Sequence, residues 1–344
     1  MKLQQDCNRL EQTPTDAGRK PQDIVSGPAP DHNMLVGVPG FEPGTSWSQT
    51  RRAYQAAPHP VRPDYTTGRA GAPQSSVAQE HSWDLRDFAA FLFDLDGTLT
   101  YPTGAVPGAP ELVRVVRALG KKVAVVTNNS RLSRRDLAAN LRGLGIPIDE
   151  PEIVTAVAAT ARLIAGQKPG ARVLAVGSAG LRAELAEHGL VLVQEPPADY
   201  VVTGVDPDLS YPRLARAVEA ILGGAGFIAV NVDRFVPTET GRMPGAALVV
   251  GALQAVVGRP PDLVVGKPAP RLLLEACRVL GVRPADALLI GDSLTSDLRA
   301  ARAAGTAFGL VLSGVTSAAD LAALDDRPDY VFETLAEVGR RLGV

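Results

Sequence analysis

Polar side chains that could carry out chemistry stand directly after apolar runs at four places in the sequence. They are Asp94 with Asp96, Thr127 with Asn128, Lys267, and Asp292 with Asp297. The run that precedes the first pair, residues 89–93, is continuously apolar, which is typical of a strand buried on both faces of a parallel sheet. Open α/β sheets place their chemistry at the carboxyl ends of such strands. The sequence therefore predicts that these side chains converge at one edge of a sheet.

This combination of residue types suits phosphoryl transfer. A carboxylate can attack phosphorus and form an aspartyl-phosphate, which divides one difficult displacement into two easier steps. Mg²⁺ prefers oxygen ligands, commonly one or two carboxylates with waters and a phosphate oxygen. A hydroxyl group and backbone N–H groups after a strand can hold phosphate oxygens, and a lysine adds a compact positive charge. Each motif alone is also typical of an ordinary turn or helix cap, so the prediction depends on all four occurring together in this order.

From Leu85 onward, strand-like apolar runs alternate with amphipathic segments typical of helices. The predicted strands cover residues 89–93, 122–126, 152–155, 172–176, 200–202, 227–231, 263–265, 287–290, 308–312 and 330–332. The predicted helices cover residues 110–119, 133–144, 181–187, 212–222, 246–257 and 270–280, and a last helix ends at 304. This alternation predicts an α/β fold with parallel strands and right-handed crossovers.

The composition is that of an ordinary globular protein. Hydrophobic residues make up 45% of the 344 positions, which is enough to fill a core. The formal net charge of −2 gives no electrostatic reason to expect a nucleic acid or an anionic membrane as partner. No apolar run is long enough to span a membrane, and two distant cysteines, Cys7 and Cys277, cannot form a disulfide framework. We expect a cytoplasmic enzyme.

Residues 1–83 differ in composition from the rest of the chain. They hold 10 of the 28 prolines and show no sustained apolar periodicity. Such a segment cannot bury enough apolar surface to offset the entropy of ordering it, so we predict a disordered tail. A second hypothesis is that translation starts near Val77, at a codon other than Met because no methionine lies between Met34 and Met243. The N-terminal mass of the natural protein distinguishes the two.

With these motifs the sequence resembles the haloacid dehalogenase superfamily of phosphatases, and its subfamily IIA in particular. Asp94-Leu-Asp-Gly-Thr is similar to the first family motif, Thr127 to the second, Lys267 to the third, and Gly291-Asp-Ser-Leu-Thr-Ser-Asp297 to the fourth. The resemblance covers residues 88–344. It implies a Rossmann-like core of residues 84–156 and 241–344. A large α/β cap, residues 157–240, is implied as an insertion between the second and third motifs.

The resemblance also implies catalytic roles for individual residues. Asp94 is the implied nucleophile. Asp96 is implied to protonate the leaving oxygen and later to activate water, which is general acid–base catalysis. Thr127 and the backbone N–H of Asn128 are implied to bind phosphate, and Lys267 is implied to hold Asp94 in place and to contact the phosphate.

A magnesium site and a set of cap contacts follow from the same resemblance. The implied Mg²⁺ ligands are the Asp94 carboxylate, the Asp96 backbone carbonyl and Asp292. Asp297 is implied to orient these ligands without binding the cation itself. The cap is expected to cover the site and to select the organic part of the substrate. Four residues are candidates for substrate contact in the cap: Ser178, Asn231, Asp233 and Arg242.

The leading interpretation is a Mg²⁺-dependent phosphatase that hydrolyses a small phosphomonoester through an aspartyl-phosphate. Two alternatives stay open: a phosphotransferase that passes the phosphoryl group to a sugar hydroxyl, and a catalytically idle regulator with the same fold. Product analysis with an acceptor sugar present distinguishes the phosphotransferase from the phosphatase. Turnover across a panel of phosphates distinguishes the idle regulator from an enzyme. The expected partner is a small phosphorylated metabolite, and the resemblance implies a homodimer through the cap.

Overall fold

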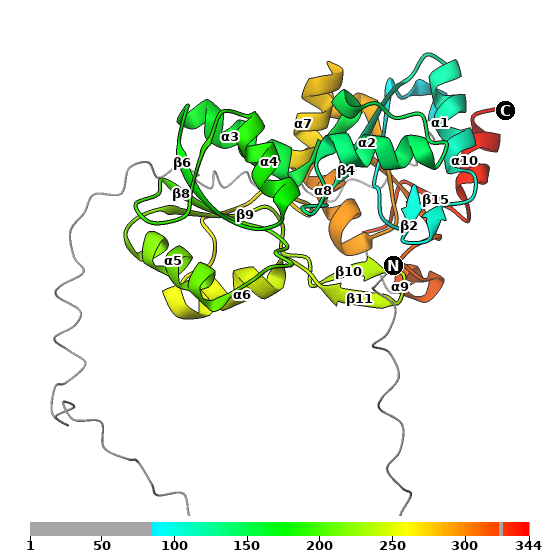
Figure 1. The fold of residues 1–344 in the computed structure, drawn as a ribbon. Helices are drawn as coiled ribbons and strands as arrows, with labels where there is room; N and C mark the ends of the chain where they lie inside the picture. Colours follow the sequence, from blue (N-terminus) through cyan, green and yellow to red (C-terminus); the bar gives the residue numbers. More distant parts are fainter. Residues whose placement is uncertain (1–83, 323–325, 344) are drawn as a thin grey trace, which may run out of the picture. The chain divides into compact units, whose positions relative to one another are not determined.

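The computed structural model describes residues 84–322 and 326–343. The predicted tail and the alternative start near Val77 lie outside these residues. The described chain forms two larger sheets, each with helices packed against it (Figure 1). Within the described ranges, no helix combines the length and the apolar character needed to cross a bilayer.

The first sheet has six strands in the order β15-β14-β13-β1-β4-β5. They are β1 (Ala90–Phe93), β4 (Lys122–Thr127), β5 (Ile153–Thr155), β13 (Ala287–Gly291), β14 (Ala307–Val311) and β15 (Tyr330–Phe332). Every pair is parallel, which confirms the predicted α/β class. Because β1 pairs with β13 on one side and β4 on the other, its carboxyl end lies in the middle of the sheet edge.

The side chains of β1 alternate between two hydrophobic clusters, as the period of two in a strand requires. Phe91 and Phe93 pack with helices on one face, and Leu92 packs with helices on the other. The first face carries α1 (Ala109–Ala118), α2 (Arg134–Gly143) and α10 (Leu335–Arg341). The second carries α7 (Arg271–Leu280) and α8 (Arg299–Ala304). All four residues of β1 are buried, so the strand holds its carboxyl end rigidly.

The second sheet has five parallel strands in the order β12-β9-β8-β6-β7. They are β6 (Arg172–Val176), β7 (Val191–Val193), β8 (Tyr200–Thr203), β9 (Gly226–Ala229) and β12 (Leu263–Val264). One face packs against α5 (Tyr211–Leu222) and α6 (Ala247–Val257). The other packs against α3 (Ala156–Gln167) and α4 (Ala179–Glu187), whose apolar residues belong to a cluster shared with the first sheet.

The second sheet continues beyond the predicted cap boundary at residue 240. Both α6 and β12 follow that position in the sequence, yet α6 packs on the second sheet and β12 pairs with β9. Strand pairing is non-local, and the apolar pattern of β12 does not show which sheet it joins. We therefore propose that the inserted cap ends near residue 265.

Several elements were not predicted from the sequence. They are α3, β7, α10, the hairpin of β10 (Phe235–Thr238) and β11 (Gly241–Pro244), the hairpin of β2 (Thr100–Tyr101) and β3 (Gly104–Ala105), and the short helix α9 (Ala318–Ala322). Helix α3 is buried almost all round, so it lacks the one-sided pattern that marks an amphipathic helix. Three 3-10 turns (Leu85–Asp87, Glu150–Glu152 and Pro284–Asp286) and a π-helical turn (Leu294–Leu298) complete the described elements.

Candidate active site

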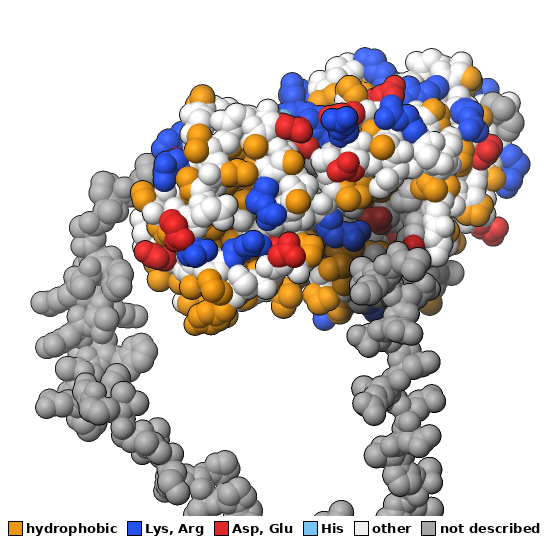
Figure 2. Space-filling model, in the orientation of Figure 1, with side chains coloured by type: hydrophobic (Ala, Val, Ile, Leu, Met, Phe, Trp, Pro, Cys, Tyr) orange, Lys and Arg blue, Asp and Glu red, His pale blue; other side chains and the backbone are white. Residues whose placement is uncertain are grey.

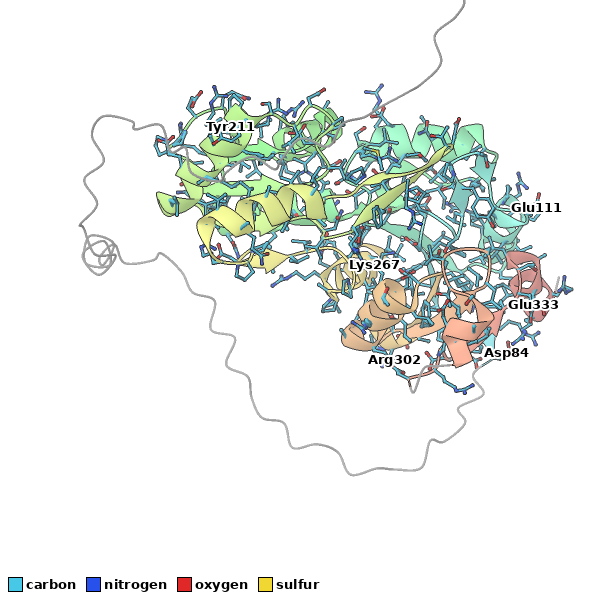
Figure 3. All side chains as sticks on the ribbon, turned by 90° about the horizontal axis from the view of Figure 1, so that it is seen from below. Asp84, Glu111, Tyr211, Lys267, Arg302 and Glu333 are labelled. Atoms are coloured by element: carbon cyan, nitrogen blue, oxygen red, sulfur yellow. The ribbon has the colours of Figure 1, made fainter. Side chains whose placement is uncertain are left out.

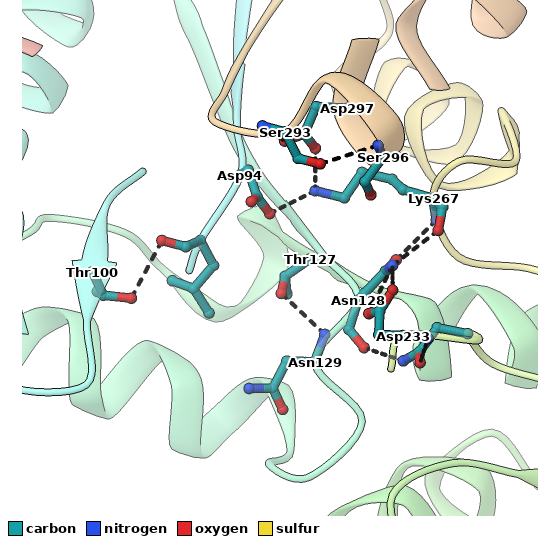
Figure 4. Close-up of polar contacts among 12 residues, drawn as sticks. Asp94, Thr100, Thr127, Asn128, Asn129, Asp233, Lys267, Ser293, Ser296 and Asp297 are labelled. Atoms are coloured by element: carbon teal, nitrogen blue, oxygen red, sulfur yellow. Dashed lines mark hydrogen bonds and ion pairs between the residues drawn. The ribbon is translucent and has the colours of Figure 1, made fainter. Parts of the chain in front are cut away.

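A buried lysine joins two carboxylates at the carboxyl edge of the first sheet (Figure 4). Asp94 directly follows β1, and its backbone N–H donates to the Ile290 carbonyl of β13 at 2.9 Å. Lys267 lies in the loop between β12 and α7 (Figure 3). Its Nζ donates to Asp94 Oδ1 at 2.5 Å and to Asp297 Oδ1 at 2.6 Å. Only 3% of the lysine side chain is exposed, so these charges interact away from bulk water. The structure thus brings three of the predicted residues into direct contact.

Asp292 completes the cluster of carboxylates. One oxygen from each of Asp94, Asp292 and Asp297 lies within 4.8 Å of the others. Asp292 follows β13 and is buried, and its Oδ2 accepts a hydrogen bond from the Val315 N–H at 2.8 Å. Three convergent carboxylate oxygens are the kind of donor set that a hard divalent cation prefers.

Asp297 has a different environment from the other two acids. Its Oδ1 accepts from Lys267 Nζ, and its Oδ2 accepts from the Ser293 N–H at 3.1 Å. Both oxygens are therefore engaged by the protein, which suits a residue that holds the lysine. Asp94 and Asp292 are better placed to offer an oxygen to a cation.

Burial and mutual repulsion shift the pKa values in this cluster. Burial raises the pKa of Asp94 well above its ordinary value, although Lys267 opposes the shift. Burial, with a further contribution from the Asp297 carboxylate, raises the pKa of Asp292 to about 6. Burial alone would lower the pKa of Lys267, but Asp297 and Asp94 together raise it, so the lysine stays charged. A cation beside Asp94 and Asp292 would favour their ionised forms, which is how the donor set fits a metal.

Two glycines allow the chain to approach the Asp292 carboxylate closely. A Cβ atom at Gly314 would lie 1.8 Å from Asp292 Oδ2, and one at Gly97 would lie 2.3 Å from the same atom. Gly97 belongs to the first motif and has a φ of +86°, a conformation that favours glycine. Gly314 belongs to no motif, and no signal in the sequence pointed to it.

Replacing Gly314 with Ala is expected to displace the Asp292 carboxylate and to lower kcat/KM for an aryl phosphate about 10- to 100-fold. The rate should be measured over a range of Mg²⁺ concentrations. Gly251→Ala is the matched control, because a Cβ atom there meets no atom within 4 Å apart from its own stretch of helix. Equal rates for Gly314→Ala and the unmodified protein at every Mg²⁺ concentration would show that Asp292 tolerates the shift.

The loop after β4 forms a tight turn beside Asp94. Thr127 is buried at the end of the strand, and its Oγ1 accepts from the Asn129 N–H at 3.0 Å. The Asn129 side chain in turn accepts from the N–H groups of Arg131 and Leu132, at 2.9 and 3.2 Å. These internal bonds hold the turn in place next to the acidic cluster, and its role as a phosphate cradle through Thr127 and the Asn128 N–H stays a prediction.

The Asn128 side chain connects this turn to the lysine loop. Its Oδ1 accepts from the Lys267 N–H at 2.8 Å, and its Nδ2 donates to the Lys267 carbonyl at 3.0 Å. The sequence predicted a role only for the backbone N–H of Asn128. The side-chain role could not be found from spacing, because the two residues are 139 positions apart.

Asp96 lies at the rim of the site. Its side chain is exposed and lines a cavity of about 490 Å³ between the β2–β3 hairpin and α2. The surrounding protein nevertheless keeps water away from the carboxyl group, and this desolvation raises the pKa of Asp96. The positive charges of Arg131 and Lys267 partly oppose the shift. Arg131 lines the same cavity and is a candidate site residue that sequence reasoning missed. Its only signal was its place four residues after Thr127.

The four predicted cap contacts lie in different surroundings. The Ser178 hydroxyl donates to the Ser130 and Arg131 carbonyls, at 2.8 and 3.0 Å, and also caps α4. Asn231 and Asp233 both contact Asn128 of the core. Arg242 is exposed on the β10–β11 hairpin, with its guanidinium 5.1 Å from the centre of the Phe235 ring. Their contact with a substrate stays a prediction.

The chain is similar over most of its described part to known hydrolases. A family model described as haloacid dehalogenase-like hydrolase matches residues 91–191, and one described as HAD-hydrolase-like matches residues 264–338. An acid sugar phosphatase from Staphylococcus aureus is 32% identical over 253 residues, which cover 74% of this chain and 97% of the relative.

Solved structures show the same likeness. A p-nitrophenyl phosphatase from Archaeoglobus fulgidus is 38% identical with a TM-score of 0.71, and the match covers 74% of this chain and 99% of that one. A glycerol phosphate phosphatase from Mycobacterium tuberculosis, solved in complexes with calcium and with magnesium, is 38% identical with a TM-score of 0.68. In the calcium complex the match covers 75% of each chain. With the four motifs gathered at one sheet edge, these matches show that the chain belongs to the haloacid dehalogenase-like hydrolase family.

Proposed function

We propose that this protein is a Mg²⁺-dependent phosphatase that hydrolyses a small phosphomonoester through an aspartyl-phosphate on Asp94. The observation that carries the proposal is the contact of Lys267 with Asp94 and Asp297 beside the Asp292 carboxylate. This arrangement holds a carboxylate, the proposed nucleophile, next to a fixed positive charge, at the edge where the proposed phosphate-binding turn also lies. The named activities of the relatives, on sugar phosphates, nitrophenyl phosphate and glycerol phosphate, support the same reaction class.

The proposed reaction has two steps. In the first, an Asp94 oxygen attacks phosphorus, the bond from phosphorus to the leaving oxygen breaks, and Asp96 gives that oxygen a proton. In the second, water attacks the phosphorus of the aspartyl-phosphate and gives its proton to Asp96. Inorganic phosphate leaves and the Asp94 carboxylate is restored. The raised pKa of Asp96 supports its role as acid, because it favours the protonated form that the first step uses.

The residues that would hold Mg²⁺ are the carboxylates of Asp94 and Asp292 and the backbone carbonyl of Asp96. The donor set consists of oxygens, as this cation prefers, and the complex of the Mycobacterium tuberculosis relative with magnesium supports the assignment. When bound, the cation supplies positive charge that reduces repulsion between the acids and a dianionic phosphate. In the proposed site, Lys267, the Thr127 hydroxyl and the backbone N–H of Asn128 hold the phosphate oxygens.

Removing divalent metal with EDTA is expected to abolish hydrolysis of an aryl phosphate, and added Mg²⁺ is expected to restore it. Without the cation, the buried carboxylates repel the phosphate dianion. Phosphate release is the measurement, and a circular dichroism spectrum before and after chelation checks that the fold is retained. Full activity after exhaustive chelation, with the metal content verified, would rule out the proposed magnesium site.

We also propose that two copies of the chain pair through the cap. Hydrophobic side chains gather over α5 and α6 (Figure 2), where the exposed members are Tyr211, Leu222, Leu248 and Val256. Val256 is 66% exposed in a helix that carries no charged residue. An apolar patch of this kind is typical of an interface. We also propose a cytoplasmic location, because the phosphorylated metabolites that the enzyme would hydrolyse are found there. Cell fractionation tests this location.

A dimer is expected in sedimentation velocity, and Val256→Glu is expected to shift it to a monomer by placing a charge in the apolar interface. Glu219→Gln on α5 is a control that changes a charge without adding one to the patch. A monomer at all concentrations of the unmodified protein would contradict the cap interface and leave the proposed chemistry untouched.

A further inference from the structure

The root of the β10–β11 hairpin in the cap is bonded to the core loop that follows β4. The Asp233 carboxylate accepts from Asn128 Nδ2, at 3.2 Å to Oδ1 and 3.1 Å to Oδ2. Asn231 Nδ2 donates to the Asn128 carbonyl at 2.6 Å, and Asn231 Oδ1 accepts from the Asp233 N–H at 3.1 Å. Two cap residues therefore hold one core residue, Asp233 by its side chain (Figure 4) and Asn231 by its backbone.

The Asn128 side chain also bonds to the backbone of Lys267, the lysine that contacts Asp94. Its Nδ2 group has two hydrogens, and the contacts to Asp233 and to the Lys267 carbonyl use both. The amide is thus oriented with Oδ1 toward the Lys267 N–H, at 2.8 Å. The backbone of Lys267 is bonded on both sides by a single side chain whose orientation depends on an acid of the cap.

The packing at this junction leaves little room for another arrangement. A Cβ atom at Gly266, just before the lysine, would lie 2.5 Å from Asn128 Oδ1. A Cβ atom at Gly245, at the other root of the hairpin, would lie 2.1 Å from the Asp233 carbonyl. Asn231 is 2% exposed. The contacts are partly buried, where hydrogen bonds to a charged group contribute more than they do in water.

We propose that Asp233 is a positioning residue, which fixes Lys267 through Asn128 and so links the cap hairpin to the nucleophile Asp94. The chain of contacts runs from the Asp233 carboxylate through the Asn128 amide to the Lys267 backbone, and from Lys267 Nζ to Asp94 Oδ1. Loss of the cap acid removes one of the contacts that orient the amide, which loosens the lysine that holds the nucleophile. This inference rests on the proposed phosphatase function for its effect on rate, but the contact itself does not depend on that function.

The test compares Asp233→Ala and Asp233→Asn with Glu239→Gln, a charge change at an exposed position between the same two strands. For Asp233→Ala, kcat on an aryl phosphate is expected to fall about 10- to 100-fold, the usual effect of removing a group that orients a site residue. KM is expected to change less than about threefold, because Asp233 supports the transition state through Lys267 rather than binding the substrate. Asp233→Asn keeps an acceptor for the Asn128 amide and is expected to recover part of the loss.

Hydrogen exchange of the Lys267 amide, followed by NMR, is the readout that does not need activity. Exchange is expected to be at least about tenfold faster in Asp233→Ala than in the unmodified protein or in Glu239→Gln. Unchanged exchange and unchanged kcat would overturn the proposal, as would a rise in KM with kcat retained, which indicates direct substrate contact. If the unmodified protein hydrolyses no phosphate ester, the proposed function fails, and the exchange rates alone decide on the positioning role.

Discussion

Asp94→Asn is expected to lower kcat for an aryl phosphate by about 10⁴-fold or more, the scale of loss seen when a covalent nucleophile is removed. The substitution keeps the shape of the side chain and an oxygen that can accept from Lys267 Nζ. It removes the negative charge that attacks phosphorus, so the covalent step cannot take place. Acid-quenched protein should carry an aspartyl-phosphate when Asp94 is present and none after the substitution.

The fold should tolerate this change. Burial raises the pKa of Asp94, which means that the surroundings disfavour its charge, and a neutral amide removes that penalty. Asp87→Asn, at an exposed position, is the matched control and should leave the rate unchanged. Activity at the unmodified level in Asp94→Asn, or a phosphorylated residue elsewhere in the chain, would exclude Asp94 as the nucleophile.

Lys267→Met is expected to reduce both stability and activity. The lysine is the shared partner of Asp94 and Asp297, and all three side chains lie in or beside the buried cluster. Removing one partner of a buried ion pair leaves an uncompensated charge and typically destabilises a protein by about 3–5 kcal/mol. The rate should fall about 10²- to 10³-fold, because a fixed positive charge at the developing negative charge is lost. Denaturant unfolding and steady-state kinetics measure the two effects.

A double variant separates the two effects. Lys267→Met with Asp297→Asn removes one of the stranded charges, so it should recover part of the stability but none of the activity. Lys168→Met is the control for an exposed pair: Lys168 is 56% exposed in its contact with Asp199, and such pairs contribute about 0–1 kcal/mol. If Lys267→Met unfolded at the same denaturant concentration as the unmodified protein, the buried pair would have no structural role.

The sequence by itself determined the sheet that carries the chemistry and the residues at its edge. Strands such as β1 are short apolar runs bounded by turns, a signal that depends on neighbours along the chain. Parallel pairing then brings the carboxyl ends of β1, β4 and β13 together, so the sequence alone placed Asp94, Thr127 and Asp292 in one site. The family motifs at these positions added the expected reaction.

Only the tertiary structure decided how the site is held in place. Strand β12 joins the second sheet, and Lys267 follows the end of this strand. The sequence does not show this, because the apolar pattern of a strand does not indicate which distant strand it pairs with. The close approach of Gly314 to Asp292, and the contact of Asp233 with Asn128, join segments that are distant in sequence. Whether a polar residue such as Asp233 faces a substrate or another side chain depends on its rotamer and on the loops around it. Residue type and spacing define which groups can react, and the packing of distant segments defines which groups orient them.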